Sequence, residues 1–460
     1  MKNKDEKHTS VLSASLVATL GGLLFGYDTA VINGAIGPME KYFGLNPQEV
    51  GWATGCALIG CVLGSAGAGW LSDNWGRKQT LLFSAVLFAI SAVGSAIPET
   101  LSAFVFYRIL GGIGVGVASL VAPMYIAEIA PPQQRGQLVS YYQLAIVIGI
   151  LGVFFANYLI AAQGDEQWLR QWGWRWMLGS ETLPALLFFV LLFFIPQSPR
   201  WLVKKGRETE ALNVLQKLRP SQQEAQEELL AIRSSVLQET HLREASLLDK
   251  GVPTVVSIGV MMSFLQQVTG INVIMYYGTE IFKSMGEATS SALFQTILVG
   301  VVNLLFTIVA IYTIDKWGRK PLVIVGSLGM ATGIFGLALC ISYENFGIIA
   351  LLSVLMFIGS FAMSMGPVVW VLLSEIFSNK IRGKAMAIAV AAQWISNFLV
   401  TQTFPILNNQ ATLQKIFNGS FAFWLYGFFC IFTMFFTWKF IPETKGKTLE
   451  EMEKVFGINA

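Results

Sequence analysis

The sequence predicts an all-α membrane protein with twelve transmembrane helices, arranged as two six-helix halves in parallel repeat. Hydrophobic residues make up 54% of the 460 residues and charged residues only 13%. The chain also holds 33 Phe and 13 Trp, more aromatic surface than a soluble domain buries. Charged motifs of the first half return, in the same order, in the second half.

Apolar segments of the length that crosses a bilayer recur along the chain. About twenty residues span roughly 30 Å of hydrocarbon at the rise of an α-helix. Inside a bilayer the backbone must satisfy its own hydrogen bonds, so these segments are predicted to be helices. The twelve predicted spans begin near residues 13, 51, 79, 103, 138, 176, 254, 291, 321, 348, 384 and 419.

The orientation of the spans follows from the basic residues. The polar head MKNKDEKHTS leads directly into a span too long for a signal-peptide core, so we expect an uncleaved first helix. Twelve spans place both termini on one side, and that side holds 25 of the 31 Lys and Arg residues. The positive-inside rule then predicts cytoplasmic termini. The membrane that we expect is a plasma membrane, such as a bacterial inner membrane. The net charge of +3 reflects this topology and indicates no nucleic-acid partner.

The second half of the chain repeats the first. DNWGRK at 73–78 returns as DKWGRK at 315–320, and PQSPRWL at 196–202 corresponds to PETKGKTL at 442–449. The offsets are 242 and 246 residues. Two halves in the same orientation, related by an axis along the membrane normal, are typical of transporters with a site near the bilayer midplane.

The repeat divides the chain into predicted domains. Between the halves, polar segments such as EALNVLQKL and SQQEAQEELLAIRSSVLQE favour short cytoplasmic helices that bridge the halves. The expected domains are an N-terminal half at 1–202, a helical linker at 203–250, a C-terminal half at 251–442 and a cytoplasmic tail at 443–460.

Acids and arginines recur together at the predicted cytoplasmic helix ends. The pattern E-x6-R-G occurs at Glu128 and Arg135 and again at Glu375 and Arg382. These residues could be topology anchors only. Because acid and base repeat together, we favour ion pairs between the halves that close the cytoplasmic side and break when it opens. The residues of this predicted cytoplasmic latch are Asp73, Arg77, Glu128, Arg135, Arg200, Asp315, Arg319, Glu375 and Arg382.

Amide and aromatic side chains within the spans form a candidate sugar site. Amides can bind the hydroxyls of a pyranose, and aromatic rings can cover its C–H face. Such amides could instead join helices to each other, but Gln266 and Gln267 precede Gly270 in a predicted helix break, which favours binding. The amides are Gln143, Gln266, Gln267, Asn272, Asn303, Gln393 and Asn397, and the aromatics are Phe25, Tyr276, Trp370 and Trp394.

Short motifs run along essentially the whole chain. They are GGLLFGYDTAV, the two D-x-W-G-R-K loops, YRILGGIGVG, PMYIAE, SPRWL, QQVTGIN, GPVVW, SEIF-x4-RG and PETKG. Through them the chain resembles the sugar porter family of the major facilitator superfamily. It is most similar to the bacterial proton-coupled D-xylose carriers, notably at RGKAMAIAVAAQW, and is also similar to the animal facilitative glucose carriers. The resemblance implies the major facilitator fold, monosaccharide transport by alternating access and no cofactor.

The resemblance also assigns the candidate sugar contacts. One position departs from the family pattern: Ile150 stands where the D-xylose carriers have a second glutamine in the fifth helix. The implied substrate is a monosaccharide of the D-xylose or D-glucose class, with a slight preference for xylose. The residues that match sugar-contacting positions of the family are Gln143, Gln266, Gln267, Asn272, Asn303, Trp370, Gln393 and Trp394.

Three charged residues lie deep within the predicted spans. By helical rise, Asp28, Arg108 and Glu181 fall at one level, about 8 Å from the outer boundary. They could form an ion pair that only fixes the helices. Alternatively, Asp28 takes a proton from outside when its contact with Arg108 loosens, since burial favours the protonated carboxyl and a guanidinium the ionised one. Proton-coupled members of the family resemble this chain at both positions, the animal facilitators have a neutral residue for the aspartate, and some bacterial facilitators keep it.

The residue patterns needed for disulfide, metal, phosphate-binding or enzyme chemistry are not found in the sequence. The four cysteines, Cys56, Cys61, Cys340 and Cys430, lie in apolar spans without disulfide or metal spacing, and no metal site is predicted. GKT at 446–448 resembles the end of a phosphate-binding loop, but position 441 is Ile instead of Gly. In GGIGVGVAS, Gly112 and Gly116 instead permit close helix approach. The spans offer no nucleophile–base pair, so we expect no enzyme.

Three classes of function remain after these exclusions. They are a sugar–proton symporter, a facilitative uniporter of the same fold, and a sugar sensor. The tail after residue 442 is short for a sensor. The amide-rich site disfavours a drug exporter. We expect a monosaccharide, a proton and the lipid bilayer as partners, and a chain that works as a monomer.

Overall fold

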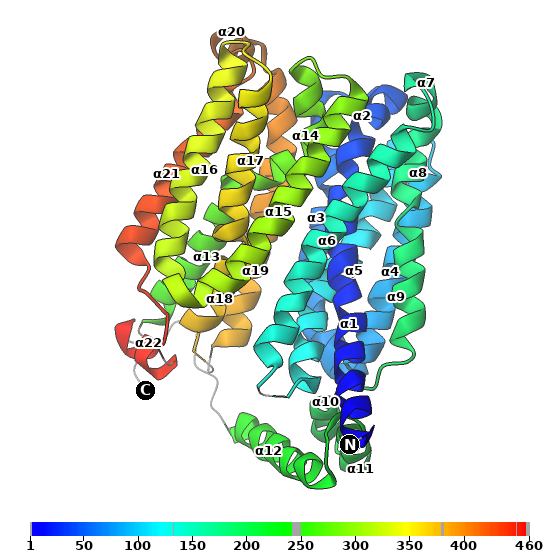
Figure 1. Cartoon of the computed structure of the whole chain (residues 1–460), viewed down its shortest axis with the longest axis vertical. Helices are drawn as coiled ribbons and strands as arrows, with labels where there is room; N and C mark the ends of the chain where they lie inside the picture. The colour runs from blue at the N-terminus through cyan, green and yellow to red at the C-terminus, as the bar shows by residue number, and fades with distance from the viewer. Residues whose placement is uncertain are drawn as a thin grey trace.

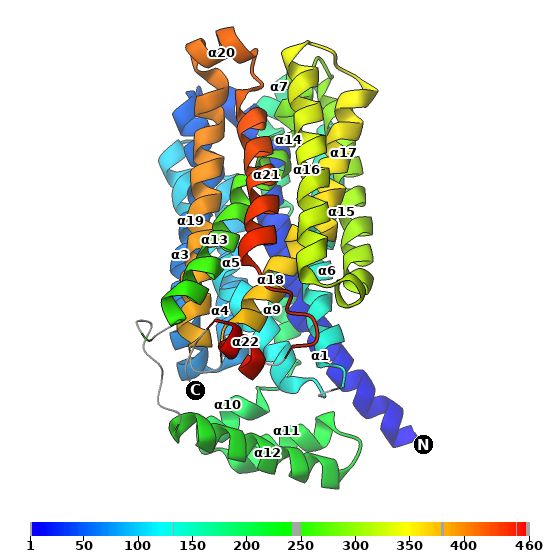
Figure 2. The same ribbon diagram turned by 90° about the vertical axis from the view of Figure 1, so that its left-hand side faces the viewer.

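The computed structural model describes residues 2–131, 133–241, 249, 251–378, 381–447 and 449–456. Two helical bundles stand side by side, one built by the first half of the chain and one by the second (Figure 1). Three helices, α10 (Pro199–Lys204), α11 (Glu208–Leu218) and α12 (Gln222–His241), form a separate layer below the bundles (Figure 2). We call this end of the molecule the linker end; the first and the last described residues lie toward it.

Within the described residues, twelve helical spans are long and apolar enough to cross a membrane, as the sequence predicts. Large apolar side chains such as Leu183, Leu187 and Trp438 are exposed on their outer surfaces, where lipid is the expected neighbour. The uninterrupted spans are α3 (Pro47–Trp75), α4 (Arg77–Ala96), α5 (Leu101–Ile129), α6 (Arg135–Ala161), α15 (Thr289–Trp317), α16 (Arg319–Ser342), α19 (Arg382–Asn409) and α21 (Phe421–Phe440). Two short helices, α20 (Ala411–Phe417) and α22 (Leu449–Val455), flank the last span.

Four spans are interrupted. The first consists of α1 (Lys2–Ala30) and α2 (Ile32–Phe43), the seventh of α13 (Val252–Val268) and α14 (Ile271–Ser284), and the tenth of α17 (Ile348–Met363) and α18 (Met365–Ile376). The sixth consists of α7 (Glu166–Trp168), the π-helical turn η1 (Leu169–Gly173), α8 (Trp174–Gly179) and α9 (Thr182–Leu192).

Only the break in the seventh span was predicted. Gly270 adopts φ +87°, a left-handed conformation that is strained for any residue with a Cβ atom. The tenth span breaks at Ser364, whose φ and ψ are −124° and −88°. The sixth breaks at Ser180 and Glu181, next to Pro184, which lacks an N–H for the helical ladder.

The start of the sixth span was predicted wrongly. Helix begins at Glu166, ten residues before the expected 176, so Arg170 and Arg175 lie in helix instead of a loop. The reason is local packing that offsets their polarity. The guanidinium of Arg175 lies 4.4 Å from the ring centroid of Trp174 and donates a 3.0 Å hydrogen bond to the carbonyl oxygen of Ala96. A hydropathy count does not detect polar helical residues at the end of a span.

Glycines bring α3 and α5 into backbone contact, as the sequence predicts. A Cβ atom built on Gly112 would lie 1.9 Å from the carbonyl oxygen of Ala57, and one on Gly116 would lie 2.3 Å from that of Cys61. Real side chains never approach backbone this closely. The two helices therefore pack through bare backbone, which fixes the position of α5 and of the charged residue that it carries.

A stability measurement can test this packing. Gly112→Ala forces α3 and α5 apart, and overpacking of this kind costs about 1–3 kcal/mol of unfolding free energy. We expect a lower thermal unfolding midpoint for the purified protein in detergent. The matched control is Gly152→Ala on α6, where the added Cβ meets no atom within 4 Å. Equal midpoints for the two variants would contradict the backbone contact.

Candidate functional site

A buried ion pair joins two helices of the N-terminal bundle. Nη1 of Arg108, on α5, donates to Oδ1 of Asp28, on α1, at 2.6 Å, and Nη2 donates to the backbone carbonyl of Asp28 at 2.9 Å. Both side chains are buried. The pairing places a carboxylate and its counter-ion inside a span, where an isolated charge would be strongly unfavourable.

Glu181 lies beside this pair, with its carboxyl group in contact with that of Asp28. It is buried and sits at the break between α8 and α9. The Ser180 hydroxyl donates to the carbonyl oxygen of Met177 at 2.6 Å, so the Tyr27 hydroxyl, 2.7 Å away, must donate to Ser180. These contacts tie the break in the sixth span to α1 and position Glu181 next to Asp28.

The three charged groups do not satisfy each other fully. Within the described residues, Oδ2 of Asp28, Oε1 of Glu181 and Nε of Arg108 have no hydrogen-bond partner. Two carboxyl groups face one guanidinium. With both acids ionised, the cluster would carry a net charge of −1 in a low-dielectric environment, and binding one proton removes that charge. The site can therefore hold a proton.

Three predicted amides form a chain across the break in the seventh span. Nε2 of Gln266 donates to the carbonyl oxygen of Met365 at 2.8 Å. Nε2 of Gln267 donates to Oε1 of Gln266 at 3.1 Å, and Nδ2 of Asn272 donates to Oε1 of Gln267 at 2.6 Å. The amides thus meet at one place because Gly270 turns the chain between them. Gln266 also bonds the backbone beside the tenth-span break, so it joins helices as well.

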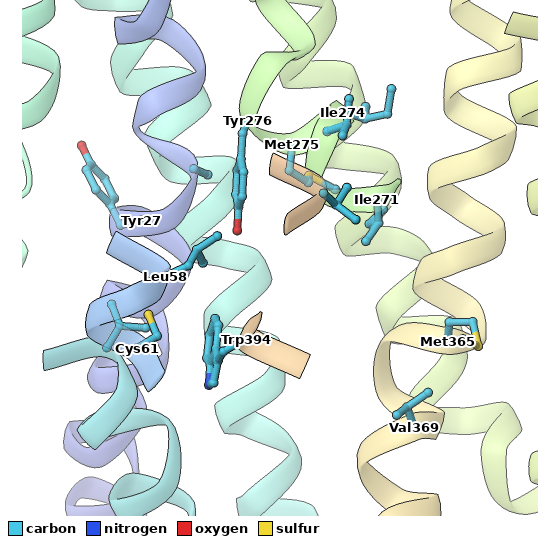
Figure 3. Close-up of a cluster of buried hydrophobic side chains, with 14 of the residues drawn as sticks. Tyr27, Leu58, Cys61, Ile271, Ile274, Met275, Tyr276, Met365, Val369 and Trp394 are labelled. Atoms are coloured by element: carbon cyan, nitrogen blue, oxygen red, sulfur yellow. The ribbon is translucent and has the colours of Figure 1, made fainter. Parts of the chain in front are cut away.

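Aromatic residues from both bundles meet at the interface between them. The rings of Phe25, on α1, and Trp394, on α19, have centroids 5.6 Å apart. Figure 3 shows Tyr276 and Trp394 between the N-terminal bundle, with Leu58 and Cys61, and the C-terminal residues Ile271 and Met365.

Polar groups on these helices remain available for a ligand. Nδ2 of Asn397 donates to the Tyr276 hydroxyl at 3.3 Å. By contrast, Oε1 of Gln393 and Nε1 of Trp394 are buried and have no partner among the described residues. Buried polar atoms are normally hydrogen-bonded, so an unpaired acceptor beside an unpaired donor favours a polar ligand.

Three predicted residues form no hydrogen bond with this group among the described residues. Gln143 is half-buried on α6, Asn303 is buried on α15, and Trp370 is half-buried on α18. Among the described residues they make no hydrogen bond or ring contact with the amide chain. A sugar contact by these residues stays a prediction.

The predicted cytoplasmic latch is built differently from expectation. In the N-terminal bundle, Arg77 donates to Glu128 at 2.9 Å and to Asp73 at 3.1 Å. In the C-terminal bundle, Arg319 donates to Glu375 at 2.7 Å and to Asp315 at 3.0 Å. All four pairs join helices of the same bundle. The expectation that they bridge the two halves is wrong for this conformation.

The turn that precedes each arginine explains this pairing. Gly76 and Gly318 have φ of +89° and +91°, so α4 and α16 start directly after a sharp turn. The guanidinium folds back onto the end of the preceding helix: Nη1 of Arg77 donates to the carbonyl oxygen of Ser72 at 3.0 Å.

The remaining arginines of the set make other contacts. Arg382 donates to the carbonyl oxygen of Phe377, and Arg200 donates to the Ser235 hydroxyl on α12. Arg135 is exposed at the start of α6 and forms no ion pair with any described residue.

Hydrogen bonds between the bundles lie at the end opposite the linker helices, and the sequence did not predict them. Nδ2 of Asn33, on α2, donates to the carbonyl oxygen of Met275 at 2.7 Å, and its Oδ1 accepts from the Thr279 hydroxyl, both on α14. Thr289, on α15, donates to Glu166. Asn33 was passed over because one amide near a span end has no distinctive neighbours in the sequence. These bonds hold the bundles together at that end.

Two residues next to the latch were also missed, although the repeat marked them. Oε1 of Gln197 accepts from the backbone N–H of Lys78 at 3.1 Å. In the second half, Glu443 accepts from the N–H groups of Arg319 and Lys320 at 3.0 and 3.1 Å. They occupy matching positions of PQSPRWL and PETKGKTL. Each caps the helix that begins at its own latch arginine.

Burial acts to raise the pKa of Glu443, but the backbone N–H donors outweigh it and hold the pKa below its usual value. A lowered folded-state pKa means that the carboxylate stabilises the fold above the pKa of an unfolded glutamate. That contribution is lost as the pH falls through the folded value.

We therefore expect Glu443→Ala to cost about 1 kcal/mol of unfolding free energy at neutral pH, since a helix start loses its acceptor. Glu443→Gln reproduces the arrangement of Gln197 and should retain most of the stability. Thermal unfolding in detergent would measure both variants, and the deficit of Glu443→Ala should shrink in acid. A deficit that is independent of pH would contradict a role for the carboxylate charge.

Comparison with known proteins extends the description to the whole chain. A family model described as "Sugar (and other) transporter" matches residues 14–456. The chain is 48% identical to the D-xylose-proton symporter of Escherichia coli (strain K12), over 99% of this chain and 97% of that protein. It is 39% identical to the glucose facilitated diffusion protein of Zymomonas mobilis, over 97% of each chain. A solved inward open conformation of the xylose transporter XylE from E. coli matches with a TM-score of 0.85 at 46% identity, over 97% of this chain and 99% of that one.

Proposed function

The chain belongs to the family of sugar transporters, and we propose that it is a proton-coupled monosaccharide symporter that works by alternating access. The proposed substrate is of the D-xylose or D-glucose class. The observation that carries the proposal is the buried cluster of Asp28, Arg108 and Glu181, which can hold one proton, in a chain that also builds a site of amides and aromatic rings.

The amide site supports a sugar as the substrate. Gln267 and Asn272 are linked across the seventh-span break, while Gln393 and Trp394 offer an unpaired acceptor and donor. A pyranose supplies hydroxyls for such groups and a C–H face for the rings of Phe25 and Trp394. Relatives named for D-xylose and for glucose agree with this class. One chain supplies all these residues, so we propose that it works as a monomer.

Charge supports the proton as the coupled ion. A proton that enters down a membrane potential gains about 2.3 kcal/mol per 100 mV. A tenfold concentration ratio costs about 1.4 kcal/mol, so one proton can drive more than a tenfold sugar gradient. Protonation of the carboxyl pair weakens the hold of Asp28 on Arg108, and this change in contact between α1 and α5 couples the proton to helix movement.

The hydrogen bonds between the bundles support alternating access. The bundles are joined by Asn33 and Thr289 away from the linker end, and each latch cluster is satisfied within its own bundle. Such an arrangement fits a carrier closed on one side and open toward its linker helices, as in the inward open XylE structure. We propose that the linker end faces the cytoplasm, that both termini lie there, and that the membrane is a bacterial inner membrane.

The sugar site can be tested by removing one amide. Gln267→Ala leaves Asn272 and a sugar hydroxyl without a partner, at a cost of about 1–3 kcal/mol. We expect D-xylose binding to weaken by about five- to a hundred-fold in titration calorimetry of the purified protein. Gln163→Ala is the matched control, because it removes an exposed amide that donates to the carbonyl oxygen of Leu159 within the same bundle. Unchanged affinity in Gln267→Ala would assign Gln267 to helix packing; D-glucose titrations would rank the two sugars.

Proton coupling can be tested at Asp28. Asp28→Asn keeps the size of the side chain and removes the charge that binds a proton. In proteoliposomes we expect no accumulation of D-xylose under an inward proton gradient, but retained exchange of labelled for unlabelled sugar. Accumulation by the variant would contradict the proposal.

A facilitative uniporter is the second candidate, favoured by the likeness to the Zymomonas protein named for facilitated diffusion. If a protonophore does not change sugar uptake by the wild-type protein, the uniporter is the correct function.

A further inference from the structure

A group of unpaired polar atoms extends from the charged cluster along α4. The hydroxyls of Ser91 and Ser95 are buried, and neither has a hydrogen-bond partner among the described residues. Oδ2 of Asp28, Oε1 of Glu181 and Nε of Arg108 are unpaired as well. Buried polar atoms without a protein partner are the usual ligands of internal water.

Gly111 shows that Ser91 and Asp28 border the same space. A Cβ atom built on Gly111, on α5, would lie 2.2 Å from Oγ of Ser91 and 3.5 Å from Oδ1 of Asp28. The absence of a side chain at Gly111 leaves the serine hydroxyl and the carboxylate facing each other from α4 and α1. Any alanine at this position would stand between them.

The two serines form a row along one face of α4, which we call the file, and it leads to the end of α4 remote from the linker helices. Ser95 lies one helical turn beyond Ser91, and α4 ends at Ala96. There Ala96 faces Gly179 of α8, whose built Cβ would lie 3.4 Å from that of Ala96. The file therefore runs inside the N-terminal bundle, between α4, α5 and the sixth span, and away from the amides of α13 and α14.

The behaviour of these hydroxyls differs from that of other hydroxyls in the same spans. Serine and threonine in a helix normally donate to a carbonyl three or four residues earlier. Thr80 does so to Gly76, and Ser84, also on α4, donates to the carbonyl oxygen of Gly114 at 2.8 Å. Ser91 and Ser95 do neither, although both are buried. Their donors are free for a ligand.

We propose that Ser91 and Ser95 hold internal water that passes protons between the outer end of α4 and the carboxyl pair of Asp28 and Glu181. The proposal rests on the proposed symport. It gives the proton a path through the N-terminal bundle, separate from the path of the sugar. The serines are positioning residues for this water; the proton hops along hydrogen bonds and no covalent bond to the protein changes except O–H bonds at the two acids.

The groups around Asp28 fit a proton path. Those that interact with the cluster are Arg108 on α5, Glu181 at the sixth-span break, Tyr27 on α1, Cys56 and Cys61 on α3, and Tyr276 on α14. Arg108 is the one cation among them. At the outer end, Arg175 donates to the carbonyl oxygen of Ala96. Its positive charge repels metal cations, whereas a proton relayed along hydrogen bonds does not require a diffusing ion.

Serine variants separate this role from a structural one. Ser91→Ala removes a hydroxyl that has no protein partner, so no protein hydrogen bond is lost and the fold should keep its stability. We expect the initial rate of proton-driven D-xylose accumulation to fall by about fivefold, and sugar exchange without a gradient to stay at the wild-type rate. The half-maximal pH of accumulation should move toward acid. Ser84→Ala, which loses a helix–helix hydrogen bond but lies away from the cluster, should keep the wild-type pH profile.

A second variant blocks the space instead of removing the hydroxyl. Gly111→Ala should slow accumulation as Ser91→Ala does, while Gly152→Ala should not. Wild-type accumulation kinetics in both Ser91→Ala and Gly111→Ala would overturn the proposal and leave the symport intact. A wild-type protein that does not accumulate sugar under a proton gradient would overturn the proposed function, and this inference with it.

Discussion

The ion pair of Asp28 with Arg108 is the interaction on which the rest of the N-terminal bundle depends. Charges are rare inside a bilayer because their burial is expensive, and they persist where a partner and a function hold them. The pair forms only if α1 and α5 pack closely enough for the two side chains to reach hydrogen-bond distance. The backbone contact of α5 with α3 through Gly112 and Gly116 provides that closeness. A second acid, Glu181, arrives only because the sixth span breaks beside it. One cation between two acids leaves room for one proton.

Irregular backbone coincides with polar side chains in three of the four interrupted spans. The sixth span breaks at Glu181, and the seventh breaks between Gln267 and Asn272. The tenth breaks at Ser364, next to Met365, whose carbonyl oxygen accepts a hydrogen bond from Nε2 of Gln266. Non-helical backbone within a membrane is tolerated only where it is buried in protein or lines a polar cavity. The helix breaks therefore lie at the proposed sugar and proton sites.

Much of this architecture could be predicted from the sequence, for physical reasons. The spans follow from the length and apolarity that a bilayer demands, and the two halves follow from the repeated motifs. The pairing of Asp28 with Arg108 followed from equal depth, because each is the only charged residue deep within its span. The sequence did not predict that Arg77 and Arg319 pair within their own bundles, because packing decides which helix ends lie together. Nor could the sequence show that the Ser84 hydroxyl donates to a backbone carbonyl while the Ser91 hydroxyl has no such partner among the described residues.

The central claim is that each sugar crosses together with a proton that this cluster holds. It is tested most directly by the external pH of a lightly buffered, de-energised suspension of vesicles that contain the wild-type protein. When D-xylose is added outside, the account predicts that the external pH rises as protons enter with the sugar, and that a protonophore abolishes the rise. Sugar entry of equal rate without any change in external pH would contradict the account.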